Sequence, residues 1–156
     1  MASIEWCLKQ KRGIELIEPN DNMSDSYFGM AEESIKILVK LQESAIWTAT
    51  ASYYIFYYSL YALMLKIGVK CEIHSCSIEF MKEFLKDFYN DGDLQNFENA
   101  FTARIDLQYY SDRPVGRENI EQSKKYCKIF FIKTKDIISK IREEQVNKIR
   151  MNLRNH

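Results

Sequence analysis

The chain has 156 residues, of which 46% are hydrophobic and 28% are charged, and its formal net charge is zero. This length predicts one domain with its own hydrophobic core, and this composition excludes an intrinsically disordered chain. A neutral chain also lacks the overall positive charge that is typical of nucleic-acid-binding proteins. Five glycines and two prolines supply little turn chemistry for a many-stranded sheet, which favours helices.

The N-terminal part predicts two helices separated by a loop. Ser3 is a candidate N-cap for a short amphipathic helix within residues 3–17. A loop follows at residues 18–26, where Ser24 or Asp25 is a candidate cap for the next helix. That helix has apolar residues at helical spacing, namely Phe28, Ala31, Ile35, Leu38, Val39 and Leu41.

Residues 45–65 contain no charged side chain and are long enough to span a bilayer. Two threonines and two serines interrupt this stretch, however, and five tyrosines lie through its middle: Tyr53, Tyr54, Tyr57, Tyr58 and Tyr61. Tyrosine prefers the membrane interface, where its hydroxyl stays hydrated, so five at bilayer depth are unfavourable. We therefore expect the central helix of a soluble bundle, which ends at Gly68, and keep a membrane span as the alternative.

The tyrosines of this helix have two interpretations. At helical spacing they are first of all core residues, each of which buries a large ring and finds a partner for its hydroxyl. The alternative is a platform on which the bases of a nucleic acid stack. Buried aromatic side chains are the commoner use, so the pattern favours the core.

The C-terminal half predicts three more helices, within residues 76–90, 94–110 and 117–150, with a loop at residues 111–116. No alternating strand pattern extends beyond a few residues. The predicted fold is therefore all-α, an up-and-down helical bundle of four to five core helices plus a short N-terminal helix. We expect a single domain over residues 1–156, with its core at about residues 25–140 and a basic C-terminal helical extension.

The charges are distributed unevenly between the two ends of the chain. Residues 1–123 carry 12 Lys/Arg against 19 Asp/Glu, whereas residues 124–156 carry 10 against 3, which gives net charges of −7 and +7. A solvated C-terminal helix explains the basic end, because the helix macrodipole favours cations there. A contact with RNA or with an acidic partner is the alternative.

The four cysteines are Cys7, Cys71, Cys76 and Cys127. Residues 1–13 lack the hydrophobic segment of a secretory signal, so we expect reduced thiols and a cytoplasmic location. Cys71, His74 and Cys76 lie close together in the sequence, but a structural zinc site needs four ligands and no second pair is visible. We expect neither a metal nor another cofactor.

Several short motifs occur in a definite order along the chain. They are Ala31, Glu32 and Ser34; then Tyr53, Tyr54 and Tyr57 followed by "YALML"; then Gly68, His74 and Ser75; then "RIDLQY" at residues 104–109; and finally "CKIFFIK". In this order and spacing, residues 25–140 resemble the HEPN superfamily (higher eukaryote and prokaryote nucleotide-binding), in particular its small stand-alone prokaryotic branch.

The resemblance implies an up-and-down helical bundle that forms a homodimer. Many members of the superfamily bind a minimal nucleotidyltransferase in toxin–antitoxin-like pairs. Active members are metal-independent ribonucleases whose motif is an arginine, four to six residues, and then a histidine, and both residues act on the RNA backbone.

This chain departs from the ribonuclease motif. Counted from Arg104, the histidine would fall at residues 109–111, which are Tyr109, Tyr110 and Ser111. Cleavage of RNA without metal needs a base and an acid, and histidine supplies both near neutral pH, whereas tyrosine has a pKa near ~10. Asp106 is available, but a salt bridge to Arg104 within the same helical turn accounts for it.

Four hypotheses follow, and the leading one is a non-catalytic, homodimeric helical module that binds a nucleotidyltransferase partner. The second is a diverged metal-independent ribonuclease that uses Arg104, Asp106 and Tyr109. The third is an RNA- or nucleotide-binding protein that uses Arg104 and the basic helix from Lys124 to Arg154, although the chain has no glycine-rich phosphate loop. In this third hypothesis, the candidate residues for contact with the nucleotide or RNA are Arg104, Tyr110, Lys124, Lys125 and Lys128. The fourth is the membrane protein considered above.

Overall fold

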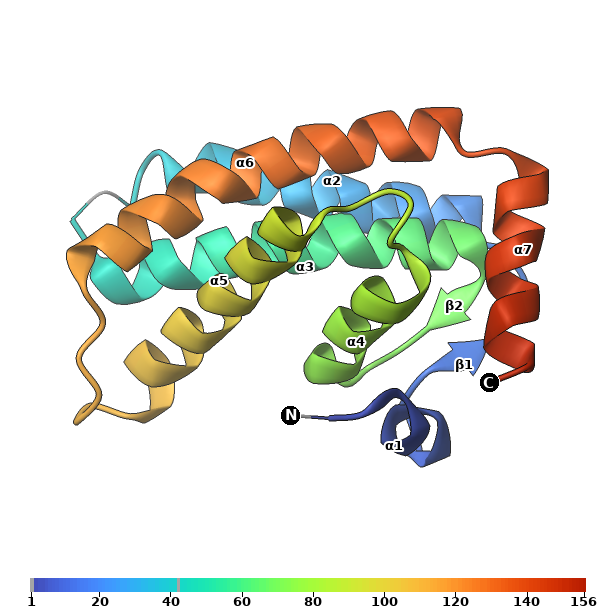
Figure 1. Ribbon diagram of the computed structural model, residues 1–156. Coiled ribbons are helices and arrows are strands. Elements are labelled where there is room, and N and C mark those ends of the chain that lie inside the picture. Colours follow the sequence, from blue (N-terminus) through green and yellow to red (C-terminus); the bar gives the residue numbers. More distant parts are fainter. Residues whose placement is uncertain (1, 42) are drawn as a thin grey trace.

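The secondary structure is almost entirely helical in the computed structural model, which describes residues 2–41 and 43–156. Within these residues the elements are α1 (Ile4–Lys9), β1 (Glu15–Leu16), α2 (Asp21–Leu38), α3 (Ala45–Ile67), β2 (Val69–Lys70), α4 (His74–Phe84), α5 (Asp91–Tyr109), α6 (Arg117–Lys140) and α7 (Glu143–Arg154). Figure 1 shows long helices that run alongside one another, so the predicted all-α helical bundle is confirmed.

Helix α3 is the axis of the bundle. It runs alongside α2 and α6, α5 crosses it obliquely, and it also contacts α4 and α7 (Figure 1). Phe56 illustrates this position, because its ring stacks on Phe97 of α5 at 5.1 Å and lies 5.0 Å from the ring of Phe130 of α6. From Thr48 onward, most of the uncharged residues predicted to form a central helix are thus buried among the other helices. Among the described residues, no helix combines the length and the apolar character needed to cross a membrane.

The helix ends follow local chemistry, with one change from the prediction. Ser3 caps α1 as expected, since its hydroxyl accepts a hydrogen bond from the backbone N–H of Trp6. Helix α2, however, is capped by Asn20, which accepts from the backbone N–H of Met23, and not by Ser24 or Asp25. The hydroxyl of Ser24 is buried instead and donates to the carbonyl of Ala62 in α3. Gly68 ends α3 in the left-handed conformation, at φ 88°.

The first predicted helix is shorter than expected, because it ends at Lys9. The chain then forms β1, which pairs antiparallel with β2, with Glu15 opposite Lys70 and Leu16 opposite Val69. This two-stranded sheet joins the N-terminal segment to the chain that leaves α3, a pairing that no local pattern indicates.

The last predicted helix is interrupted at Ile141 and Arg142, which are extended and separate α6 from α7. Helix α7 folds back over the end of α3, as Figure 1 shows. One Nη of Arg150 donates to the carbonyls of Ile17, Ile67 and Gly68 at 2.8–3.1 Å. A helix leaves its last carbonyls without partners, and a cation is favoured there. The basic C-terminal segment is therefore part of the fold and not a free extension.

A disulfide between Cys7 and Cys76 joins α1 to α4. The expectation of reduced thiols is therefore wrong for these two residues. The pair closes a loop across a sequence separation of 69, which in the chain-entropy account contributes about 4 kcal/mol to stability. Cys71 and Cys127 are free and buried, and burial raises the pKa of both thiols.

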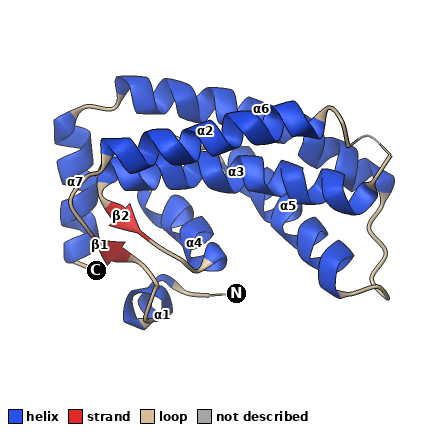
Figure 2. Ribbon diagram, turned by 180° about the vertical axis from the view of Figure 1, so that it is seen from behind, coloured by secondary structure: helices blue, strands red, loops and turns tan. Residues whose placement is uncertain are grey.

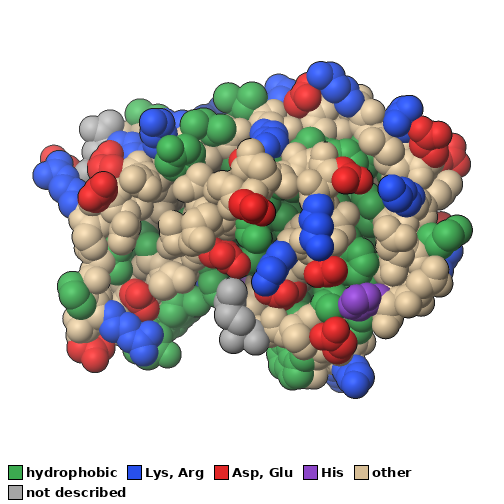
Figure 3. Space-filling model, in the orientation of Figure 1, with side chains coloured by type: hydrophobic (Ala, Val, Ile, Leu, Met, Phe, Trp, Pro, Cys, Tyr) green, Lys and Arg blue, Asp and Glu red, His purple; other side chains and the backbone are tan. Residues whose placement is uncertain are grey.

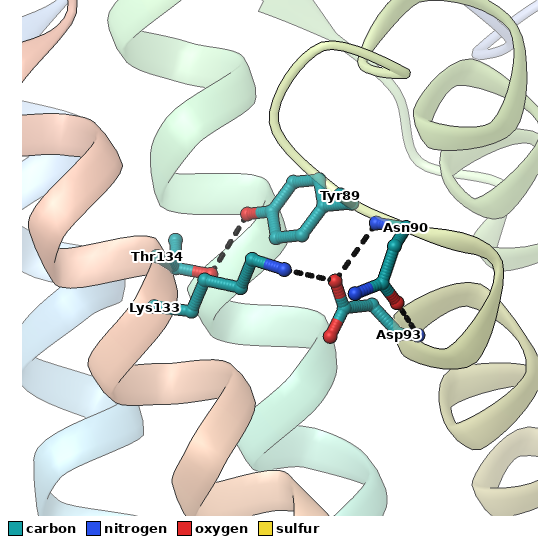
Figure 4. Close-up of polar contacts among 5 residues, drawn as sticks. All are labelled: Tyr89, Asn90, Asp93, Lys133 and Thr134. Carbon is teal, nitrogen blue, oxygen red and sulfur yellow. Dashed lines mark hydrogen bonds and ion pairs between the residues drawn. The ribbon is translucent and has the colours of Figure 1, made fainter.

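A polar network fixes the beginning of α5 against α6 (Figure 4). Asn90 and Asp93 form a reciprocal capping box, and Asp93 also pairs with Lys133 of α6. Beside them, the buried hydroxyl of Tyr89 lies 2.7 Å from the hydroxyl of Thr134. Burial raises the pKa of Tyr89, so this contact is a hydrogen bond between two neutral groups.

The Tyr89–Thr134 hydrogen bond predicts a strongly non-additive pair of mutations. Thr134→Val should lower the free energy of unfolding by about 1–3 kcal/mol, because it leaves the buried Tyr89 hydroxyl without a partner. Adding Tyr89→Phe removes that hydroxyl, so the double variant should be more stable than the additive sum of the two single variants. Urea denaturation of all four proteins measures this coupling, and simple additivity would contradict it.

Candidate functional site

Among the described residues, aromatic and cationic side chains from three helices form one cluster. It consists of Tyr53, Tyr54 and Tyr57 on two adjacent turns of α3, His74 at the start of α4, and Arg104 of α5. Tyr53 and Tyr57 are buried, whereas the other three side chains are partly exposed. The sequence interpretation of these tyrosines as core residues is therefore confirmed for Tyr53 and Tyr57, while Tyr54 reaches the surface.

The guanidinium of Arg104 lies on aromatic rings. Its central carbon is 4.5 Å from the ring centroid of Tyr53, 5.6 Å from that of Tyr54 and 5.9 Å from that of Phe101. One Nη donates to Gln108 at 3.4 Å. The Nε is buried and has no hydrogen-bond partner among the described residues. Cation–π attraction thus holds the guanidinium, and any contact of Arg104 with another molecule would use its Nη groups, since the Nε is enclosed.

His74 is neutral at physiological pH. Burial lowers the pKa of His74 to about 4, and the positive charge of Arg104 lowers it further in the same direction. The imidazole stacks on Tyr57, with ring centroids 4.0 Å apart, and its Nδ1 lies 2.5 Å from the hydroxyl of Tyr53. Burial raises the pKa of Tyr53, so its hydroxyl keeps its proton and the contact with Nδ1 is a hydrogen bond between two neutral groups.

The cluster borders an open hollow on one side of the molecule. Figure 3 shows a notch at the lower edge, between the part formed by α5 and the part formed by α1. A cavity of about 650 Å³ is lined by Ala2, Ser3, Trp6, Ser75 and Phe101. Phe101 belongs to this lining and also to the rings around Arg104. The aromatic surface next to Arg104 is therefore accessible to another molecule.

Asp106 and the two tyrosines at the end of α5 do not join this cluster. Asp106 pairs with Arg113 at 3.3 Å, so the expected salt bridge to Arg104 is wrong. Arg113 lies 3.8 Å from the ring centroid of Tyr110, on the loop that follows α5. Tyr109 is 70% exposed. The candidate acid–base pair of Asp106 and Tyr109 therefore lies outside this cluster, with Asp106 engaged by Arg113.

The basic candidates of α6 are also separate from Arg104. Lys124 lines a groove with Ser44, Thr48 and Arg117, near the beginnings of α3 and α6. The ammonium of Lys125 lies over the ring of Tyr126, and Lys128 is half-buried on the same helix. Helix α6 packs on the side of α3 that carries Phe56, whereas Arg104 lies over Tyr53. Glu32 is exposed on α2 and takes part in no contact with the cluster.

The position of His74 is the main feature that sequence reasoning missed. No histidine follows Arg104 at the spacing of the ribonuclease motif. His74 precedes Arg104 in the sequence, yet both residues contact Tyr53. The resemblance named His74 and the tyrosines as motif residues but gave no indication that they surround Arg104. Only the packing of α4 and α5 on the same turns of α3 brings them together.

Of the side chains in this cluster, that of His74 is the common metal ligand. Among the described residues, no three His, Cys, Asp or Glu side chains are close enough together to hold a metal ion. Cys76, which was considered with Cys71 and His74 as a partial zinc site, is bonded to Cys7. What the cluster offers is hydrogen-bond donors of one guanidinium and the faces of several aromatic rings.

Comparison with known proteins does not extend this description. No protein-family model matches the chain, and no curated protein matches it. Any function must therefore be argued from the residues themselves.

The low pKa of His74 predicts a measurable pH dependence. The unfolded chain binds this proton near pH 6.5 and the folded chain near pH 4, so the stabilisation by neutral His74 is complete above pH 6.5. It is lost as the pH falls from 6.5 to 4. Titration of the His74 ring by NMR should show a midpoint near 4, and Arg104→Met should raise that midpoint. Arg113→Met is the matched control, and a wild-type midpoint at 6.5 would contradict the assignment.

Proposed function

We propose that the chain is a non-catalytic, HEPN-like helical module that acts as a homodimer and binds a minimal nucleotidyltransferase in a toxin–antitoxin-like pair. The observation that carries this proposal is a row of aromatic rings that ends at Arg104. Tyr27 of α2 lies 6.0 Å from Tyr58, Tyr58 lies 5.2 Å from Tyr54, and Arg104 lies 5.6 Å from Tyr54. Tyrosine and arginine are the residues that concentrate binding energy in protein interfaces.

The partly exposed position of this row favours a protein partner. All four side chains are half-buried, so their orientations are fixed before a partner arrives and little conformational entropy is lost on binding. The guanidinium can donate to a carboxylate or a backbone carbonyl of the partner while the rings supply apolar contact area.

The state of His74 supports a role without catalysis. Metal-independent cleavage of RNA needs one group that accepts a proton and another that donates one near neutral pH. With a pKa of about 4, His74 is uncharged near neutral pH and is therefore a poor proton donor. Its Nδ1 is already hydrogen-bonded to the hydroxyl of Tyr53. Arg104 remains a binding group in this arrangement.

Binding of single-stranded RNA or of a nucleotide is the second candidate. Bases stack on aromatic faces, and a guanidinium matches the oxygens of a phosphate, so the same row could hold a base beside Arg104. Yet the lysines of α6 lie elsewhere, and α2 carries four acidic residues against one basic residue. The site therefore offers one cation where tight binding of RNA uses several.

We also propose that the protein is located in the cytoplasm. Disulfides are rare in that compartment because thiol reductants are abundant there. Both sulfurs of the Cys7–Cys76 pair are buried, which restricts the access of such reductants.

Affinity capture from native cells tests the partner. The wild-type protein should retain a nucleotidyltransferase, identified by mass spectrometry, and Tyr54→Ala and Arg104→Ala should each reduce the captured amount at least tenfold. Lys125→Ala is the control, since this residue lies on α6 outside the row. Capture of RNA alone would favour the second candidate, and equal capture by all four proteins would contradict the assigned surface.

The absence of catalysis is tested with total RNA and a chelator. We expect intact RNA with the wild-type protein, because His74, the histidine of the cluster, is uncharged near pH 7 and so is not the acid that cleavage needs. Arg104→Ala and His74→Ala are incubated in parallel. Cleavage by the wild type that disappears in both variants would overturn the proposal in favour of a ribonuclease, whereas equal cleavage in all three tubes would identify a contaminating enzyme.

A further inference from the structure

Helix α2 carries two rows of residues at the four-three spacing of a coiled-coil seam. The inner row packs into the core and consists of Ser24, Phe28, Ala31, Ile35 and Leu38. The outer row, displaced by one residue, consists of Met23, Tyr27, Met30, Ser34 and Ile37. Met23, Met30 and Ile37 are each about 40% exposed, at 42%, 39% and 45%. Such a seam suits a second helix, and Figure 2 shows α2 as the foremost helix, with no described helix over it.

We infer that this outer row is the contact surface for a second copy of the same chain, whose α2 packs antiparallel to the first about a two-fold axis at Met30. The inference rests on the homodimer of the proposed function and names its interface. In this arrangement Met30 faces Met30 of the second copy, and Met23 faces Ile37 of the second copy. A two-fold contact must be self-complementary, and the ends of the row meet this condition because Met23 and Ile37 lie at equal distances along the sequence from Met30.

The row contains no charged side chain, and the hydroxyl of Ser34 already donates to the carbonyl of Met30 at 2.7 Å. Burial of a charge would oppose association, and the row brings none to the contact. Tyr27 is half-buried, so its hydroxyl can stay hydrated at the edge of the contact or find a partner there.

The charges along α2 favour the antiparallel direction. Asp21 and Asp25 lie near its N-terminal end, while Lys36 and Lys40 lie at and just beyond its C-terminal end. Antiparallel pairing brings the acidic end of one copy near the basic end of the other, and it also opposes the two helix dipoles. Parallel pairing would bring like charges together.

The same charges disfavour other occupants. The four acidic residues of α2 would repel an anionic membrane surface and the phosphates of RNA. A second copy brings the same acidic residues, but it also brings the uncharged row and the lysines at the C-terminal end of α2, which an anionic membrane surface or RNA lacks. Trp47, which is 57% exposed at the beginning of α3, and Val39 at the end of α2 add apolar surface near one end of the row. A stable interface buries roughly 800 Å² on each partner, and one helix row alone supplies only part of this area.

Light scattering at micromolar concentration tests the interface. The wild-type protein should have a mass of about 37 kDa, twice that of the 18.5 kDa chain. Met30→Glu should shift it to 18.5 kDa, because two carboxylates would meet at the axis. Met151→Glu is the matched control, since Met151 is an exposed methionine of α7, and it should remain dimeric. Circular dichroism melting confirms that both variants are folded.

Oxidative cross-linking provides a second measurement. Met30→Cys should form a covalent dimer on mild oxidation, because the residue meets its own copy at the axis, whereas Met151→Cys should not. A folded Met30→Glu variant that stays at 37 kDa, or equal cross-linking of the two cysteine variants, would overturn this interface and leave the homodimer itself standing. A monomeric wild type would overturn both, but partner capture by that monomer would still support the partner-binding part of the proposed function.

Discussion

Burial of the uncharged side chains of α3 is the constraint on which the rest of the structure depends. Each large apolar side chain removed from water contributes roughly 1.5–3 kcal/mol, and α3 carries such residues on nearly every face. One neighbouring helix cannot cover them, so α2, α5 and α6 surround α3 and α4 and α7 pack against it as well. Burial also encloses polar groups, which then need partners inside the protein. Arg150 donates to carbonyls at the end of α3, and the hydroxyls of Tyr89 and Thr134 bond to each other.

The candidate site lies where α4 and α5 cover Tyr53 of α3. Tyr53 places a hydroxyl where no water can reach it, and His74 supplies the partner. The same low-polarity surroundings keep His74 uncharged and strengthen the attraction between Arg104 and the tyrosine faces. The cluster is thus rigid and neutral except for one guanidinium, which suits recognition better than proton transfer.

Helix α2 has more apolar surface than its contact with α3 buries. The inner row of α2 packs into the core, whereas the outer row, with the same heptad spacing, is partly exposed to solvent. The aromatic row that reaches Arg104 begins at Tyr27, which also belongs to the outer row of α2. The two proposed contacts therefore share Tyr27, so burial of this ring between two copies would leave Tyr58, Tyr54 and Arg104 for the partner.

The sequence by itself determined the helices, the central place of α3, the Ser3 cap and the end of α3 at Gly68, because each depends on residues within a few positions of one another. Only the tertiary structure decided three other features. They are the Cys7–Cys76 bond, the break of the last helix at Ile141, and the meeting of His74 with Arg104 on Tyr53. Periodicity shows which face of a helix is buried but not which neighbour covers it. Contacts between distant residues therefore follow from the packing of whole helices.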